Sequence, residues 1–399
     1  MKKLVIALVA LFPFSALALE QSYIVTVDND VTGKIQNLNS NFVLESEQIK
    51  PDKILNSINS FVAKLTPEQV QYLKKSGVKI RPDRERHILG YPDSAPNQDL
   101  ERNPEYTYGL ENIGLIEMRA AHPELTGEKV VVGIIDSGID PKHPAFAGKE
   151  IVFKDFTANK SEPYDDNGHG THVAGTISGV GSPNFGIAPK VKLVIAKVFS
   201  ASGSANDSTI LAAMEWVQTQ GVSVVNNSWG GEQDDTDPDT PYNRMVKSWI
   251  SKNIFPSFAA GNSGPKDGTM SIPGGYLESF AVGSVDELDK LSRFSSKGPI
   301  VWKGSKYSKP DICAPGSKVY SSIPNGKYAY FSGTSMATPH VTGVVALLKQ
   351  ADPKMNVSSV WNVLTTSAKD VNLKVTECGS GRLDANSAVE MVLSNSKSE

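Results

Sequence analysis

Three short segments place a side chain that can do acid–base or nucleophilic chemistry among glycines and other small residues. Asp136 follows the apolar run 130–135, His169 stands in a glycine-rich segment that also holds His172, and Ser335 precedes an apolar helical pattern. A serine hydroxyl becomes a strong nucleophile when a base takes its proton, and the base is usually a histidine oriented by a carboxylate. These residue types therefore indicate acyl-transfer chemistry, with Asp136, His169 and Ser335 as the candidate triad.

Each of these residues also has a structural interpretation. Asp136 could cap a turn, and Ser335 could be the N-cap of its helix. His169 and His172 could be metal ligands, but the zinc-protease pattern needs i, i+4 spacing with a glutamate between, and here a glycine and a threonine stand between the two histidines. We interpret His172 as a buried, hydrogen-bonded support for the loop of His169. A helix that begins at Ser335 would direct its free N–H groups towards an oxyanion.

The elements around these residues predict an α/β domain. Short runs rich in β-branched residues recur along the chain, at 130–135, 191–195, 222–225 and 280–282. Helical patterns lie between several of them, and Asp207 could cap one of these helices. Strands that alternate with helices indicate a parallel sheet covered on both faces, with sites at the carboxyl ends of its strands. Asp136 stands at such an end.

Residues 22–90 predict a separate, small α/β unit. Thr66 is expected to be the N-cap of a helix whose first turn holds a proline and the capping-box residue Gln69, and Gly77 is expected to end this helix. Residues 91–107 are polar and hold three prolines, which is typical of a linker.

The motifs together resemble those of subtilisin-like proteases. The segments 136–140, 169–175 and 333–340 are similar to the three active-site motifs of that family, and their Asp, His, Ser order is the subtilisin order. The resemblance extends from about residue 108 to 388. It implies a three-layer α/β catalytic domain with a mainly parallel sheet, expected over 101–399, and a serine endopeptidase activity. A transpeptidase on the same scaffold and a non-catalytic adhesin remain as alternatives.

The resemblance also implies roles for residues outside the triad. Asn262 would donate its side-chain amide to the oxyanion beside the Ser335 N–H. Seven residues would bind an extended substrate strand or form the wall of the pocket for the residue before the cleaved bond: Ser228, Trp229, Gly230, Gly203, Ser204, Ala259 and Gly261. Because strand pairing works through the backbone, specificity should be broad. The pocket floor falls near Ser271, and no acidic residue is evident there, so an apolar side chain is favoured.

The N-terminal unit resembles the inhibitory propeptide of these proteases, most clearly over 61–70. We therefore expect residues 19–100, propeptide and linker, to act as an intramolecular inhibitor that is removed by self-cleavage; a permanent accessory domain is the alternative. Tyr91 aligns best with the family's cleavage point, but Pro92 lacks an N–H and has a fixed φ, so it should fit badly after the cleaved bond. Cleavage is predicted after an apolar residue such as Leu89 or Leu100.

The first residues predict export, and the composition bears on the expected partners. Two lysines, a short apolar run and small residues predict a signal peptide over 1–18, so a secreted, extracellular protein is expected. The chain has 399 residues, of which 39% are apolar. Its net charge of −3 argues against nucleic acid or an anionic membrane as a main partner, because both call for a concentrated basic surface. Polypeptide substrates are the expected partners, and a monomer is the expected state.

The sequence has two cysteines, Cys313 and Cys378. Export permits a disulfide, but two cysteines make no framework, and two partly buried thiols are an equal alternative.

No cofactor is required by the predicted chemistry, and calcium is expected to bind weakly if it binds. Calcium-stabilised subtilisins carry an aspartate at the position matched here by Ala145, and the loop 179–189 is two residues shorter than theirs. The segment 232–239 holds five carboxylates, which could bind calcium weakly or could simply be solvated.

Overall fold

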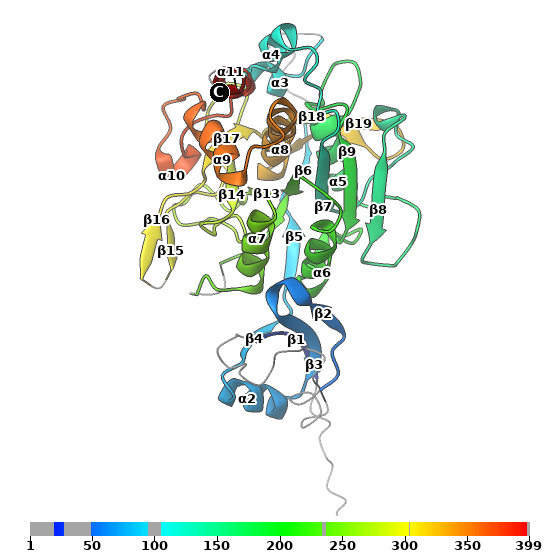
Figure 1. The fold of residues 1–399 in the computed structure, drawn as a ribbon, viewed down its shortest axis with the longest axis vertical. Helices are drawn as coiled ribbons and strands as arrows, with labels where there is room; N and C mark the ends of the chain where they lie inside the picture. The colour runs from blue at the N-terminus through cyan, green and yellow to red at the C-terminus, as the bar shows by residue number, and fades with distance from the viewer. Residues whose placement is uncertain (1–19, 28–48, 95–104, 234–236, 303, 397–399) are drawn as a thin grey trace, which may run out of the picture. The chain divides into compact units, whose positions relative to one another are not determined.

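The computed structural model describes residues 20–27, 49–94, 105–233, 237–302 and 304–396 (Figure 1). The chain divides into two compact units: Met1–Ile54 with Asn59–Pro82, and Leu55–Ile58 with Asp83–Glu399. The predicted signal peptide, 1–18, lies outside the described residues. Within the described ranges, no helix is long and apolar enough to cross a membrane.

The first unit is a four-stranded sheet with one helix. Its strands lie in the order β2-β3-β1-β4: β2 (Lys53–Leu55), β3 (Ser60–Leu65), β1 (Gln21–Thr26) and β4 (Lys79–Pro82). Helix α2 (Pro67–Lys75) begins after Thr66, whose hydroxyl accepts from the Gln69 N–H while the Gln69 side chain accepts from the Thr66 N–H. The predicted capping box is therefore confirmed. Val25, Phe61 and Leu73 are buried in the core of this unit.

The second unit is built on a seven-stranded sheet. Its strand order is β17 (Ile312–Pro315), β14 (Phe280–Val285), β13 (Phe255–Ala259), β11 (Val224–Asn227), β7 (Val131–Asp136), β9 (Lys192–Lys197) and β8 (Ile151–Asp155). All six neighbouring pairs are parallel. The predicted α/β class with a mainly parallel sheet is confirmed, and the β-branched runs of the sequence are its central strands.

Helices cover both faces of this sheet. Four helices that pack on it are α5 (His169–Ser178), α6 (Asp207–Val217), α7 (Pro241–Ser251) and α8 (Thr334–Ala351). Val132 and Ile134 of β7 share a core cluster with the apolar side chains of α8. Gly133, between them, faces the other way, since a Cβ there would lie 2.8 Å from Val217 of α6. Successive strand residues point to opposite faces, so α6 and α8 cover opposite sides of the sheet.

Shorter elements complete this unit (Figure 1): η2 (Asn56–Ile58), β5 (Glu85–Ile88), β6 (Tyr91–Asp93), α3 (Tyr108–Asn112), α4 (Leu115–Ala121), η4 (Pro144–Phe146), β10 (Ser204–Asn206), β12 (Trp229–Gly230), β15 (Ile300–Trp302), β16 (Ser305–Tyr307), β18 (Val319–Ile323), β19 (Lys327–Ser332), α9 (Val357–Thr366), α10 (Val375–Cys378) and α11 (Ala385–Ser396). A disulfide joins Cys313 of β17 to Cys378 of α10, so of the two alternatives for these cysteines the structure has the bridge.

Two expectations about local structure are corrected. Residues 91–93, predicted as the start of a linker, form β6, an edge strand antiparallel to β19. An edge strand can tolerate a proline, because one side of its backbone makes no ladder hydrogen bonds. Asp207 does not cap α6: the N-cap is Asn206, and the Asp207 carboxylate accepts hydrogen bonds from Arg86 and Tyr242 instead.

Candidate active site

Asp136 and His169 meet at the carboxyl edge of the sheet. Asp136 is the last residue of β7, and His169 is the first residue of α5. The Nδ1 atom of His169 lies 2.8 Å from Oδ1 of Asp136, and both side chains are buried. Among the described residues, Nε2 of His169 has no hydrogen-bond partner. A carboxylate on Nδ1 holds the proton there and leaves Nε2 as the basic atom.

Ser335 lies in the first turn of α8 and is fully buried. Its hydroxyl donates to the carbonyl of Ser228 over 2.7 Å, and the Ser228 hydroxyl donates to the Ser335 carbonyl over 2.9 Å. Gly90 lies beside the imidazole of the histidine, since a Cβ built on it would stand 2.9 Å from Nε2 of His169. The sequence therefore brings an aspartate, a histidine and a serine to one edge of the sheet from three different elements.

The carbonyl oxygen of Leu89 sits between two donors. It accepts from Nδ2 of Asn262 over 2.7 Å and from the backbone N–H of Ser335 over 3.2 Å. The Asn262 amide is itself oriented, because its Oδ1 accepts from the Thr334 N–H over 3.0 Å and from the Thr334 hydroxyl over 2.9 Å. This is the geometry of an oxyanion hole, with the positive end of α8 adding to it.

Strand β5 lies where an extended substrate is expected. It pairs antiparallel with β10 on one side and with β12 on the other. The Ile88 N–H donates to the Gly203 carbonyl, and the Leu89 N–H donates to the Ser228 carbonyl, both over 3.2 Å. Five of the residues predicted to bind substrate thus line β5 or continue its pairing: Ser228, Trp229, Gly230, Gly203 and Ser204.

The side chain of Leu89 is directed at the predicted pocket. A Cβ on Gly230 would lie 3.1 Å from a Leu89 methyl carbon and 3.1 Å from the Ser271 Cβ. Ala259 ends β13, and Gly261 follows it with φ +115°, where a Cβ would stand 2.3 Å from the Ser271 hydroxyl. Glycine is needed at position 261 for both its backbone angle and its space.

His172 lies one turn along α5 from His169 and is enclosed by protein. Its Nε2 lies 3.0 Å from the Val319 carbonyl, and its ring stacks on Phe331 with centroids 4.4 Å apart. Burial lowers the pKa of His172 to about 3, so the ring is neutral at pH 7. These contacts agree with the supporting role predicted for it. Within the described residues, no group of three or more His, Cys, Asp or Glu side chains could hold a metal ion.

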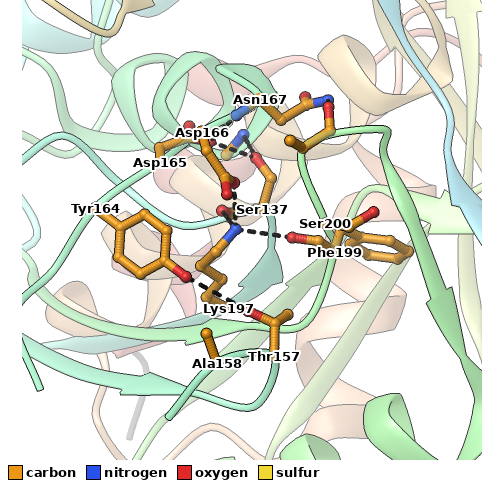
Figure 2. A network of polar contacts seen from close by, with 12 residues as sticks. Ser137, Thr157, Ala158, Tyr164, Asp165, Asp166, Asn167, Lys197, Phe199 and Ser200 are labelled. Atoms are coloured by element: carbon orange, nitrogen blue, oxygen red, sulfur yellow. Dashed lines mark hydrogen bonds and ion pairs between the residues drawn. The ribbon is translucent and has the colours of Figure 1, made fainter. Parts of the chain in front are cut away.

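Sequence reasoning missed a buried lysine beneath this site. Lys197, the last residue of β9, has no exposed surface. Figure 2 shows its ammonium directed at Asp166, over 2.6 Å, and at the carbonyls of Ser137 and Phe199, over 2.7 and 2.8 Å. A buried ammonium is tolerated only when its protons are bonded and its charge is paired. Lys197 therefore connects the segment after Asp136 to the loop ahead of α5. The sequence signal that could have identified it is a charged residue at the end of an apolar strand.

Asp165 makes a second link in the same network (Figure 2). One carboxylate oxygen accepts from the Ser137 hydroxyl over 2.9 Å and from the Gly168 N–H over 2.8 Å. The other accepts from the Thr171 N–H over 2.9 Å and from its hydroxyl over 2.6 Å. A carboxylate at the start of a helix satisfies N–H groups that have no partner within the helix. Asp165 therefore fixes the first turn of α5, and with it the ring of His169, relative to β7.

Comparison with known proteins shows the family to which the sequence is similar. The model of the subtilase family matches residues 127–383. The chain is 34% identical to Bacillopeptidase F of Bacillus subtilis over 81% of its own length, but it spans 24% of that protein. It is 32% identical to subtilisin E of Bacillus subtilis, over 82% of this chain and 80% of that one. It is 36% identical to subtilisin Savinase of Lederbergia lenta, over 69% of this chain and 97% of that one.

The family match covers most of the chain, and the matched residues include Asp136, His169, Asn262 and Ser335. The chemistry of such a site uses side chains and backbone of the protein alone and needs no cofactor. The chain belongs to the subtilase family and is a subtilisin-like serine endopeptidase.

Proposed function

We propose that this protein is a secreted protease made as a zymogen, which cleaves its own chain between Leu89 and Gly90. The observation that carries this proposal is the Leu89 carbonyl oxygen, which accepts from both Asn262 and the Ser335 N–H. Because β5 occupies the strand position between β10 and β12, the segment ahead of this bond also blocks other polypeptide substrates. The segment ahead of the Leu89–Gly90 bond therefore inhibits the protease until that bond is cut.

In the proposed mechanism, Ser335 attacks the Leu89 carbonyl carbon and His169 takes the hydroxyl proton on Nε2. Asp136 holds the imidazole and stabilises its charged form, and Asn262 with the Ser335 N–H binds the oxyanion. His169 then gives the proton to the departing amine of Gly90, and water releases the acyl-enzyme. The attack requires the Ser335 hydroxyl to turn from the Ser228 carbonyl towards Nε2 of His169, which no other hydrogen bond occupies among the described residues.

Gly90 suits the position after the proposed cut. A Cβ on this residue would lie 2.9 Å from Nε2 of His169 and 2.8 Å from Sδ of Met336. Real Cβ atoms do not approach heavy atoms this closely, so a larger residue would push the imidazole from the attacking hydroxyl. The stretch 86–90 therefore combines an apolar residue before the bond with the smallest residue after it.

The specificity proposed for other substrates follows from the same contacts. The Leu89 methyl group lies against the backbone of Gly230 and near Ser271, an uncharged environment that favours an apolar residue before the cleaved bond. Backbone pairing on both sides of β5 accepts many sequences. We propose a monomer that acts on polypeptides outside the cell and uses no nucleic acid or membrane partner.

The position of self-cleavage is the test of this proposal. N-terminal sequencing of the purified mature protein is expected to give Gly90 as the first residue. Leu89→Asp should slow processing by about 10-fold or more, because the pocket would have to bury a carboxylate. Leu100→Asp, a matched change at the other apolar candidate, should leave processing unchanged. Cleavage after Leu100 that proceeds equally in the Leu89→Asp variant would overturn the proposed cut.

Calcium is expected to stabilise the protein weakly. Ala145 is buried and has no side-chain oxygen, and its carbonyl already accepts from the Val180 N–H. Chelation should lower Tm by less than about 5 °C in differential scanning calorimetry, since a site filled at 100 Kd adds about 2.7 kcal/mol, or roughly 5–10 °C. Adding calcium back is the control. A drop of more than about 10 °C on chelation would show a strong site.

A further inference from the structure

Arg86 lies at a defined distance from the proposed cleavage point. It is the fourth residue before the Leu89–Gly90 bond, counting Leu89 as the first. Within β5 it pairs with Ala205 of β10. Its neighbours Glu85 and His87 are exposed, whereas Arg86 is only 5% exposed. The side chain of this residue therefore points into the protein while the strand runs along the surface.

The guanidinium of Arg86 binds the carboxylate of Asp207, the first residue of α6. Nε of Arg86 donates to Oδ1 of Asp207 over 2.7 Å, and Nη2 donates to Oδ2 over 3.3 Å. The two side chains are 6% and 7% exposed. This fork-to-carboxylate geometry is available to arginine and not to lysine, whose ammonium is a single point charge.

Two further residues shape this site. The Tyr242 hydroxyl donates to Oδ1 of Asp207 over 2.8 Å, and its ring lies 6.0 Å from the guanidinium carbon of Arg86. Gly231 provides space, because a Cβ there would stand 2.4 Å from Nη1 of Arg86. The hydroxyl orients the carboxylate, and the ring face adds a weak cation–π attraction.

The charge of Asp207 depends on what occupies the site. Burial raises the pKa of Asp207, and the Arg86 guanidinium opposes that rise. Once self-cleavage releases the segment ahead of Gly90, Arg86 leaves with it. A buried carboxylate without a cation is unfavourable, so a substrate arginine is bound more tightly because it restores the ion pair that Arg86 made with Asp207. A substrate with an uncharged residue at this position leaves the Asp207 carboxylate unpaired.

We infer that Asp207, with Tyr242 and Gly231, forms a subsite that selects arginine four residues before the bond cleaved in other polypeptides. The substrate class is a peptide with arginine at that position and an apolar residue directly before the cut, as in the chain's own segment 86–90. This inference rests on the proposed function, because the proposed cut defines the position of Arg86. It narrows a specificity that backbone pairing alone would leave broad.

The test uses the mature wild-type enzyme and quenched fluorescent peptides that contain the sequence of residues 83–93. The arginine that corresponds to Arg86 is replaced by lysine, citrulline or alanine. Citrulline keeps the shape of the arginine side chain without its charge. We expect kcat/KM for the arginine peptide to exceed that for the citrulline and alanine peptides by about 30-fold or more, with lysine between. Mass spectrometry of the products locates the cut.

Asp207→Asn supplies the second arm. This variant should bring the ratio of kcat/KM between the arginine and alanine peptides to about 3 or less. Glu128→Gln is the matched control, since it neutralises a carboxylate that is 55% exposed ahead of β7. The control should keep the wild-type ratio.

The outcomes separate the two proposals. Equal kcat/KM for the arginine, citrulline and alanine peptides, all cut between leucine and glycine, would overturn the subsite and leave the proposed function intact. A cut at another bond, or no cut in any peptide by an enzyme that digests casein, would overturn the assigned position of Leu89 and the subsite with it. Because the peptide series needs no variant, the inference is tested even if Asp207→Asn fails to fold.

Discussion

Replacing Ser335 with alanine is expected to abolish self-cleavage and to lower kcat on polypeptides by about 10⁶. In subtilisin, a member of the same family, loss of the nucleophilic serine lowers kcat by about 2 × 10⁶, and this figure sets the expectation here. The physical reason is that the variant has no hydroxyl on the residue whose N–H binds the Leu89 oxygen. Ser335→Ala should therefore accumulate as a chain that begins near Leu19 and keeps residues 19–89.

The experiment has to separate lost chemistry from retained inhibition. Ser335→Ala zymogen is first processed in trans by a small amount of tagged wild-type enzyme, which is then removed, and its activity on casein is measured. Wild-type zymogen treated in the same way is the control, and serine-directed acylating reagents should inactivate it while zinc chelators should not. A mature N-terminus in Ser335→Ala expressed without other proteases, or near-normal turnover after trans-processing, would refute the assignment of Ser335 as nucleophile.

Asn262→Ala is expected to lower kcat by about 10²–10³ with little change in KM. This range is the one known for removal of the oxyanion-hole asparagine in subtilisin, and it is carried to this chain by the matching geometry. Nδ2 of Asn262 lies 2.7 Å from the Leu89 carbonyl oxygen, and the Ser335 N–H, at 3.2 Å, would be left as the remaining donor. The lost bond matters most when that oxygen becomes negative, so the effect falls on kcat.

Thr334→Val is the matched control for this prediction. The Thr334 hydroxyl orients Asn262 over 2.9 Å but does not contact the Leu89 oxygen. Its removal should reduce kcat by less than about 10-fold, because the backbone N–H of the same residue still holds the asparagine amide. Steady-state kinetics on one peptide with both variants would decide the point. A decrease in kcat below about 3-fold for Asn262→Ala would contradict an oxyanion role.

The sequence alone determined the class of fold and the candidate triad. Runs of β-branched residues separated by helical patterns can be buried on both faces only in a parallel sheet, so the α/β architecture followed from periodicity. Asp136, His169 and Ser335 were found because each stands among small residues at the end of a strand or the start of a helix. Thr66 and Gln69 predicted the start of their helix, since a capping box satisfies backbone groups within a few residues and does not depend on the rest of the chain.

The tertiary structure alone decided which distant residues meet. Arg86 and Asp207 are 121 positions apart in the sequence. The local pattern predicted Asp207 as a helix cap, but in the structure its carboxylate accepts a hydrogen bond from the Arg86 guanidinium. Nothing in the local sequence distinguishes Leu89, and only the position of β5 between β10 and β12 places its carbonyl beside Asn262. Local signals arise from interactions within a few residues along the chain. Charge pairing, strand insertion and disulfide formation depend on spatial proximity, which folding creates between residues far apart in sequence.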